Sequence, residues 1–309
     1  KATAKAKCTV NKNITLYAVQ KKAVQLTFHR CDGSTWQKTT LAKGSSYSLP
    51  GVRDAEGYTF MGWSTKPMQS VSPQYEAEEK ITVNGNVDLY AVVFNRTTET
   101  DLTEDQLPQV DIYKYKQVIF VGDSRTEFME NVLTGMGESA TKNVKFVCSA
   151  GKGLDWFTTT GWAQLYSIVQ HDSNSILSKK TAVIFNFGVN DLSKSADYAE
   201  YYNWIAPQLK SKGCELYFMS VNPVNRLMLP NAGRADRSEA AVRSFNQYMK
   251  ANLSSAYTYI DMYSYLKSTG YSFASDHYGT GTVDDGLHYT TRTYKRIFAK
   301  CMDSLRVPA

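Results

Sequence analysis

The stretch Val118-Ile119-Phe120-Val121-Gly122-Asp123-Ser124-Arg125-Thr126 decides the fold of the larger part of this chain. Its four consecutive apolar residues are typical of a buried strand, and Gly-Asp-Ser after them indicates a sharp turn into a helix. Between later apolar runs, segments such as residues 198–212 and 239–252 have helical periodicity. Apolar strands that alternate with helices predict a parallel sheet covered on both faces. The further predicted strands are residues 144–148, 182–187, 216–220 and 257–260.

Three short strings lie where such a sheet places its ligands. Val121-Gly122-Asp123-Ser124-Arg125-Thr126 and Gly188-Val189-Asn190-Asp191 follow predicted strands, and Asp285-Gly286-Leu287-His288 lies in the last loop. Because open α/β sheets bind ligands at the carboxyl ends of their strands, the three strings predict a single site.

Ser124 has two interpretations. At a strand-to-helix turn it is similar to the nucleophile elbow of serine hydrolases, which holds a hydroxyl out of the sheet. Ser124-Arg125-Thr126-Glu127 also fits a capping box, in which Ser124 only caps the helix that follows. Serine is a common N-cap residue, so the string alone does not decide between them.

Asn190 is a candidate hydrogen-bond donor for an oxyanion. One such donor typically lowers the reaction barrier by about 3 to 4 kcal/mol. An Asn-Asp pair after a strand is also common in a plain turn.

Asp285 and His288 form the candidate acid and base. Their three-residue spacing lets the carboxylate reach the imidazole from one tight loop, where it would fix the tautomer and stabilise the imidazolium. Asp284 is an alternative orienting acid. The non-catalytic interpretation is an Asp-Gly turn beside a surface histidine. The remaining histidines are expected to be structural or solvated: His29, His171 and His277.

The order of these strings resembles the SGNH hydrolase superfamily, the GDSL esterases and lipases. Gly122-Asp123-Ser124 matches the first block of that family, residues 188–191 match the third, and residues 285–288 match the last. The resemblance implies a three-layer α/β/α, flavodoxin-like domain over residues 113–309. It also implies Ser124 as the nucleophile, His288 as the base, Asp285 as its orienting acid, and no metal or organic cofactor.

The same resemblance implies an oxyanion hole with three donors. They are the Ser124 N–H, the Asn190 side chain and the backbone N–H of a glycine after the second strand. Ser149-Ala150-Gly151-Lys152-Gly153 offers two glycines, of which Gly153 is favoured and Gly151 is the alternate.

Two further residues are expected to bind substrate. Arg125 stands where the family commonly has Leu, and a cation beside the nucleophile favours a polar or anionic substrate over a lipid. Trp156, just past the glycine loop, is a candidate for lining an acyl or sugar pocket, with core packing as the alternative.

The N-terminal part contains a repeat. Leu-Tyr-Ala-Val occurs at residues 16–19 and again at 89–92, each time three residues after an Asn. Between the copies, a Gly-Tyr-Thr-Phe-x-Gly-Trp string and an alternating strand pattern indicate a small strand-rich module. This resembles the Listeria-Bacteroides, or internalin B-type, surface repeat of Gram-positive bacteria, which implies a β-grasp-like fold. We expect the tail of a preceding repeat at residues 1–20, a module at 22–95 and an exposed linker at 96–112.

Composition excludes several classes of function. The net charge of +6 is spread over the chain, so no basic face predicts a nucleic-acid or anionic-lipid partner. The five cysteines form no C-x-x-C pair, which leaves a zinc site without support. No apolar run reaches the roughly 18 residues that span a bilayer, so no membrane insertion is expected of this fragment, which lacks a starting Met.

The resulting hypothesis is an extracellular or cell-wall-associated serine esterase. It would remove short acyl groups, such as acetyl, from a carbohydrate, a small molecule or another polar ester, and the repeat would provide surface attachment. The alternatives are a lipase or thioesterase type of SGNH enzyme, an acyltransferase that uses the same triad, and a surface-binding or adhesion protein with an inactive hydrolase-like domain.

Overall fold

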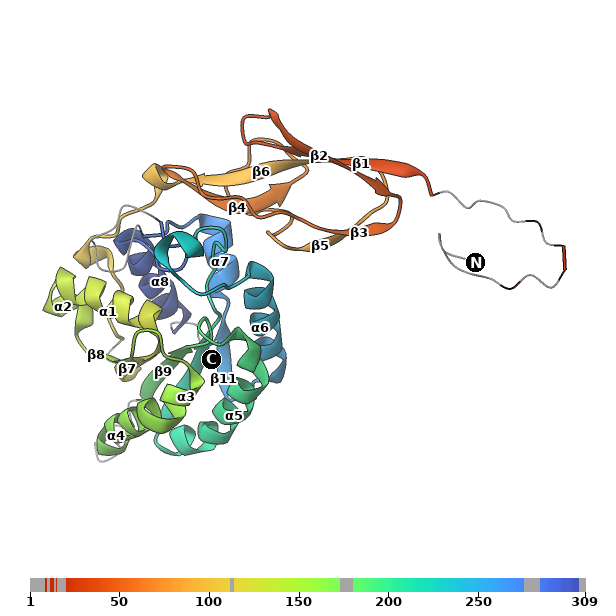
Figure 1. The fold of residues 1–309 in the computed structure, drawn as a ribbon. Coiled ribbons are helices and arrows are strands. Elements are labelled where there is room, and N and C mark those ends of the chain that lie inside the picture. The colour runs from red at the N-terminus through yellow and green to blue at the C-terminus, as the bar shows by residue number, and fades with distance from the viewer. Residues whose placement is uncertain are drawn as a thin grey trace.

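The computed structural model describes residues 21–111, 114–172, 180–274 and 284–305, together with the single residues 9, 12, 13 and 15. It contains an N-terminal strand-rich module and a larger α/β domain (Figure 1). The predicted tail of a preceding repeat at residues 1–20 lies outside the described residues, apart from those four.

The α/β domain is built on a five-stranded parallel sheet. Every neighbouring pair of strands is parallel, in the spatial order β11-β10-β9-β7-β8. This is the flavodoxin-like order, and the strand order reverses between β7 and β9, where such sheets bind ligands. The predicted parallel sheet is confirmed. Its strands are β7 (Tyr115–Gly122), β8 (Val144–Cys148), β9 (Lys180–Asn186), β10 (Cys214–Met219) and β11 (Tyr257–Ile260).

Helices cover both faces of this sheet and make three layers. Side chains alternate along β7: Ile119 and Val121 join one buried cluster, whereas Val118 and Phe120 join the other. The first cluster is covered by α4 (Trp162–Asp172), α5 (Ser195–Ser211) and α6 (Glu239–Asn252), and the second by α1 (Ser124–Met136), α7 (Met262–Thr269) and α8 (Thr291–Ser304). Short helical segments complete the domain: α2 (Glu138–Thr141), α3 (Leu154–Trp156), η3 (Phe157–Gly161), η4 (Leu192–Lys194) and η5 (Leu229–Ala232).

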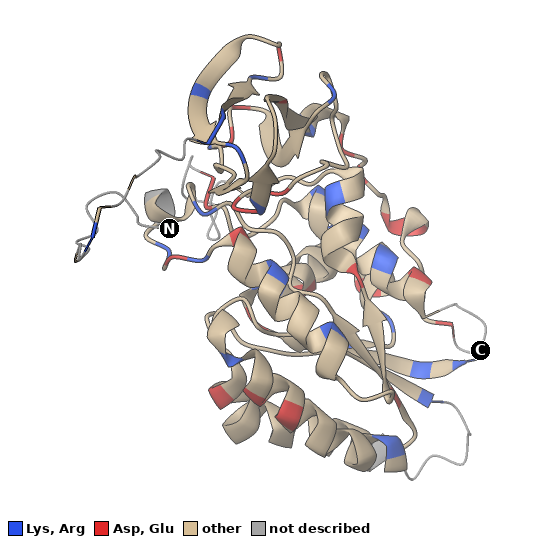
Figure 2. Ribbon diagram, turned by 90° about the vertical axis from the view of Figure 1, so that its right-hand side faces the viewer, with Lys and Arg blue, Asp and Glu red and all other residues tan. Residues whose placement is uncertain are grey.

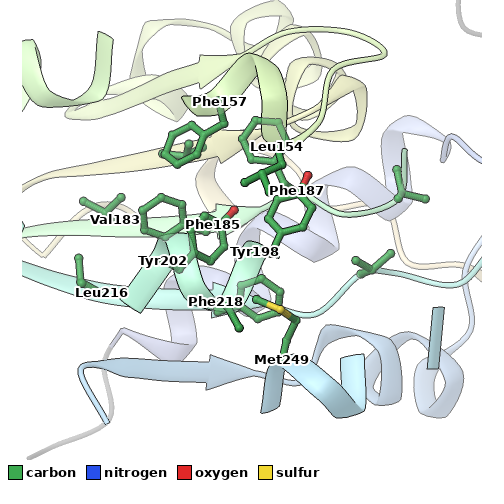
Figure 3. Packing of buried hydrophobic residues seen from close by; sticks show 14 of the residues in the cluster. Leu154, Phe157, Val183, Phe185, Phe187, Tyr198, Tyr202, Leu216, Phe218 and Met249 are labelled. Carbon is green, nitrogen blue, oxygen red and sulfur yellow. The ribbon is translucent and has the colours of Figure 1, made fainter. Parts of the chain in front are cut away.

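The first cluster is rich in aromatic rings. Phe185 of β9 packs against Tyr202 of α5 with ring centroids 4.7 Å apart, and Phe157 lies edge-on to Phe185 at 5.8 Å (Figure 3). Such pairs add about 0.5 to 1.5 kcal/mol each to the effect of burial. They hold the carboxyl end of β9, and the turn that follows it, in a fixed position.

The N-terminal module is a four-stranded sheet with a small two-stranded sheet beside it. Its central strands, β1 (Ala23–His29) and β6 (Val87–Asn95), are parallel, and the outer strands are antiparallel to them in the order β2-β1-β6-β4. Leu26, Phe28 and Trp63 are fully buried in its own core. The other strands are β2 (Thr35–Ala42), β3 (Ser45–Ser48), β4 (Tyr58–Ser64) and β5 (Lys80–Val83).

The predicted exposed linker at residues 96–112 has many exposed residues where the structure describes it, but it is not a free connection between the two parts. It forms two short helical turns, η1 (Arg96–Thr98) and η2 (Glu104–Gln106), and Leu107 and Val110 are buried in the second cluster of the α/β domain. The Glu99 carboxylate is also buried and pairs with Arg296 of α8 at 2.9 Å. The segment is therefore part of the packed domain.

The module packs directly on the α/β domain. Met61, Val92 and Phe94 of the module belong to the second buried cluster. The buried Lys267 ammonium of α7 donates to the Met61 carbonyl at 2.6 Å and pairs with the carboxylate of Glu76 at 2.8 Å. Residues of both parts thus contribute to the second buried cluster, while the module also keeps a core of its own.

Basic and acidic residues are interspersed over both parts of the molecule (Figure 2). Among the helices of the described residues, none combines the length and the apolar character needed to cross a membrane.

Candidate active site

Ser124 is the first residue of α1, directly after β7. The N-cap is Asp123, whose carboxylate accepts a hydrogen bond from the Arg125 N–H at 3.0 Å. The capping interpretation of Ser124 is therefore wrong, because the preceding aspartate fills that role. The Ser124 hydroxyl is free to point elsewhere, and its N–H belongs to the first turn, where backbone donors have no partner within the helix.

The Ser124 hydroxyl lies against His288. Ser124 Oγ is 2.9 Å from His288 Nε2, and His288 Nδ1 is 2.5 Å from Asp285 Oδ2. All three side chains are buried. The other Asp285 oxygen accepts from the N–H groups of Leu287 and His288 at 2.8 Å, so the turn orients its own carboxylate. The structure thus brings three of the predicted residues together across 164 positions of chain.

The electrostatics of this trio favour a neutral imidazole. Burial lowers the pKa of His288, and the nearby Arg125 and Arg234 act in the same direction against the raising effect of Asp285. Burial would raise the pKa of Asp285, but the hydrogen bond and charge of His288 outweigh it and hold that pKa below its usual range. An ionised carboxylate can only accept, so the imidazole proton belongs on Nδ1 and the Nε2 lone pair faces Ser124.

The alternative acid, Asp284, is engaged elsewhere. Its carboxylate pairs with Arg96 at 2.5 Å. Asp285 is the carboxylate that reaches the histidine.

Asn190 lies in the turn after β9, held between two partners. Its Nδ2 donates to the Lys152 carbonyl at 2.8 Å, and its Oδ1 accepts from Arg237 Nη2 at 2.8 Å. Arg237 also donates to the Val189 carbonyl at 2.6 Å. Because a guanidinium has no acceptor, it fixes which way round the amide lies and turns the NH₂ group away from itself.

The glycine loop is held against the same turn by Asp191. Its Oδ2 accepts from the Leu154 N–H at 2.9 Å and its Oδ1 from the Tyr198 hydroxyl at 2.7 Å. A Cβ on Gly153 would overlap this carboxylate, so only glycine fits there. Gly151 is instead exposed, with open space around it. Gly153, the favoured glycine, is thus the one packed beside the Asn190 turn.

Arg125 does not face a substrate, which corrects the expectation from the sequence. Its side chain is buried, and its guanidinium donates to the carbonyls of Leu287, Asn222 and Pro223 at 2.8 to 3.0 Å. It also lies over the Tyr289 ring, 5.2 Å from the centroid. Arg125 ties the nucleophile turn to the loop of His288.

Trp156 packs on the aromatic core. Its ring lies 6.0 Å from that of Phe187, and a Cβ on Gly161 would lie only 2.7 Å from an atom of the indole. The packing interpretation of Trp156 accounts for these contacts, and a role in lining a substrate pocket stays a prediction.

Sequence reasoning missed several residues that hold the site together. Glu127, assigned above to a capping box, accepts from the Ala150 N–H at 2.7 Å and so joins α1 to the glycine loop. Arg234 lies 3.6 Å from Asp285 Oδ2. Arg237 orients Asn190. An excess of arginine between residues 226 and 237 was the available signal, but the partners are remote in sequence.

A polar cavity borders Asn190 on the side of Arg237. It encloses about 390 Å³. Its walls come from the turn after β9 and from the segment before α6, and they include Asn190, Ser193, Arg226, Asp236, Arg237 and Ser238. Across the ranges that the structure describes, no group of three or more His, Cys, Asp or Glu side chains could hold a metal ion.

Comparison with known families agrees with this geometry. The family model of the GDSL-like lipase/acylhydrolases matches residues 118–301, more than half of the chain, and the Listeria-Bacteroides repeat domain matches residues 25–92. The chain belongs to the GDSL-like lipase/acylhydrolase family and carries a Listeria-Bacteroides repeat in front of that domain. Among curated proteins, none matches this chain in sequence.

Solved structures of SGNH hydrolases are similar to the α/β domain. A proposed SGNH hydrolase from Slackia heliotrinireducens is 13% identical, with a TM-score of 0.43 over 62% of this chain and 100% of its own. A proposed acylhydrolase from Bacteroides fragilis is 16% identical, with a TM-score of 0.41 over 65% and 93%. An acetyl xylan esterase is 11% identical, with a TM-score of 0.41 over 62% and 100%. Likeness at this level says nothing about the substrate.

Proposed function

We propose that this chain is a serine esterase that hydrolyses short acyl esters, such as acetyl esters, of a carbohydrate or another polar alcohol. One observation carries the proposal: a buried serine hydroxyl lies 2.9 Å from a histidine whose other nitrogen is 2.5 Å from a buried carboxylate. This arrangement activates a hydroxyl as a nucleophile.

In the proposed reaction, Ser124 Oγ attacks the ester carbonyl while its proton moves to His288 Nε2. The carbon–oxygen bond to the alcohol then breaks, and the alcohol leaves with that proton. Water attacks the acyl-enzyme in the same way, so the acid is released and Ser124 is restored. Asp285 stabilises the imidazolium in both steps.

The oxyanion would be held by the Ser124 N–H, the Gly153 N–H and the Asn190 side-chain amide. Support comes from the packing of Gly153 beside the Asn190 turn and from the orientation that Arg237 imposes on the amide. Preorganised donors of this kind are usually the largest single contribution to catalysis.

The cavity beside Asn190 supports the proposal that the alcohol part of the ester is polar. Arg125 does not support it, because its side chain is buried. Hydroxyl, carboxylate, amide and guanidinium groups line that cavity, and such groups pair with the hydroxyls of a sugar. The surface repeat supports an extracellular or wall-associated location. Partners of the repeat are part of the same proposal.

Replacing the nucleophile tests the reaction. Ser124→Ala is expected to lower kcat on p-nitrophenyl acetate by at least about 10⁴-fold without loss of the fold, since only the nucleophile is removed. Ser211→Ala, at the exposed end of α5, is the matched control and should keep wild-type activity. If wild type neither hydrolyses the ester nor reacts with a fluorophosphonate, the chain is no serine esterase and the binding-protein alternative holds.

Acyl-chain length tests the substrate class. Turnover of p-nitrophenyl esters should fall from acetyl to palmitoyl, and acetylated oligosaccharides should be deacetylated. A preference for long chains would contradict the short-chain proposal while leaving the serine chemistry intact.

A further inference from the structure

Asp54 of the N-terminal module is a buried carboxylate that joins the module to the loops of the candidate active site. Its side chain has no exposed surface. Oδ1 accepts from the Phe60 N–H at 2.9 Å and from Asn225 Nδ2 at 2.8 Å, and Oδ2 accepts from Arg96 Nη2 at 2.8 Å. One carboxylate therefore connects β4, the start of η1 and the loop after β10.

Both links lead to the turn that carries Asp285 and His288. Arg96 bridges Asp54 to Asp284, the residue before Asp285. The Asn225 N–H donates to the Gly286 carbonyl at 2.8 Å, inside the same turn. Gly286 has φ +68°, and a Cβ there would overlap the Asn225 carbonyl, so the two segments meet backbone to backbone.

The segment at residues 222–225 is held from two sides. The module holds it through Asn225, whose Nδ2 also donates to the Val52 carbonyl at 3.1 Å. Arg125, next to Ser124, donates to the carbonyls of Asn222 and Pro223 and to that of Leu287. The positions of Ser124 and His288 relative to each other therefore depend on this segment.

We infer that Asp54 is a positioning residue of the esterase: through Asn225 and Arg96, the surface repeat holds the turn of Asp285 and His288 in its productive place. The inference rests on the proposed function. The repeat is then part of the catalytic apparatus, in addition to any role in attachment.

The test is Asp54→Asn in the full chain. The variant keeps the shape but removes the charge that pairs with Arg96, and one of its two acceptors becomes a donor. We expect kcat on p-nitrophenyl acetate to fall about 10- to 100-fold with KM changed less than about threefold, since a displacement of 1 Å at a catalytic group costs about that much. In the same variant, the midpoint of the acid limb of the kcat/KM profile should shift, because a displaced turn changes the contact between Asp285 and His288.

Glu78→Gln is the matched control. Glu78 also bridges module and domain, to Arg226 at 3.3 Å and the Ala240 N–H at 3.2 Å, and among the described residues its side chain has no hydrogen bond to the turn of His288. It should keep the wild-type kcat and pH profile.

Asn225→Ala and the double variant show whether Asp54 acts through Asn225. Asn225→Ala should also lower kcat, and the loss in the double variant should be smaller than the product of the two single losses, because part of the Asp54 effect runs through Asn225. Wild-type kcat in a folded Asp54→Asn, or additive losses in the double variant, would overturn the inference. If Asp54→Asn does not fold, Asn225→Ala becomes the deciding variant, and a wild-type kcat in it would overturn the inference. Failure of the proposed function is distinct, since wild type would then be inactive.

Discussion

At the scale of single residues, three consecutive residues of the nucleophile turn have three different roles. Asp123 caps α1, Ser124 faces the histidine, and Arg125 anchors the loops on the far side of the site. Burial raises the pKa of the Asp123 carboxyl to about 6 against the lowering effect of Arg125. Because Asp123 and Arg125 bond to other groups, the Ser124 hydroxyl pairs with His288 alone among these contacts.

The lowered pKa of His288 predicts activity at mildly acidic pH. Only the neutral imidazole can take the serine proton, so kcat/KM should fall as pH drops through the histidine pKa, with a midpoint below the ordinary value of about 6.5. Asp285, Arg125 and Arg234 are the charged groups that act on it.

Arg234→Gln should move that limb to higher pH, because removal of a nearby cation raises the histidine pKa. Arg292→Gln, on the exposed side of α8, is the control and should leave the limb unchanged. A wild-type midpoint above 6.5, or a shift to lower pH in Arg234→Gln, would show that the electrostatic account is incorrect.

At the scale of elements, the loops that follow the two strands flanking β7 make the candidate oxyanion hole. The turn after β9 provides Asn190 and Asp191, and the loop after β8 provides Gly153. Asp191 and Asn190 each bond to the glycine loop, so the two candidate donors are held in register. Arg237, before α6, fixes the amide from outside.

Arg237→Met should therefore lower kcat by about 10- to 100-fold with little change in KM, since loss of one oxyanion donor costs up to about 10³-fold. The reason is that the Asn190 amide loses the guanidinium that sets its orientation. Steady-state kinetics on p-nitrophenyl acetate measure it, with Arg292→Met as the control. In an Asn190→Ala background the substitution should have no further effect, and a full additional loss would contradict a role through Asn190.

The sequence predicts the elements better than it predicts their contacts. Mainly apolar runs identify all five strands of the parallel sheet, although Lys145 and Thr258 interrupt two of them, and local spacing identifies Asp285 with His288. Arg125 was misassigned because its partners are carbonyls some 97 to 162 residues away. Residues 96–112 were expected to be exposed because their composition is polar, and composition does not reveal that Glu99 meets Arg296.

At the scale of the whole molecule, the repeat and the α/β domain form one packed body. The second buried cluster includes residues of both, and Lys267 and Glu239 of the domain meet Glu76 of the module in a buried ionic cluster. Replacing one member of this cluster would leave an uncompensated buried charge, which costs about 3 to 5 kcal/mol.

Phe94→Ala tests this unity. Phe94 lies in the module but is buried in the cluster of the domain, so its truncation should lower the free energy of unfolding by about 3 to 5 kcal/mol. Urea unfolding followed by fluorescence and circular dichroism should show one transition that shifts as a whole. Met68→Ala, at an exposed position, should change it by less than about 0.5 kcal/mol. Two separate transitions, of which only one shifts, would contradict a single body.

The parallel pairing of β1 and β6 also sets how the protein responds to tension. Leu26 to His29 pair in register with Val87 to Tyr90, and the chain enters the module at the start of β1 and leaves it at the end of β6. A pull between those two points acts along the strands, so the hydrogen bonds of this ladder are loaded together in shear instead of opening one at a time. The rate of forced unfolding, which governs survival under load, is then set by the rupture of the whole ladder.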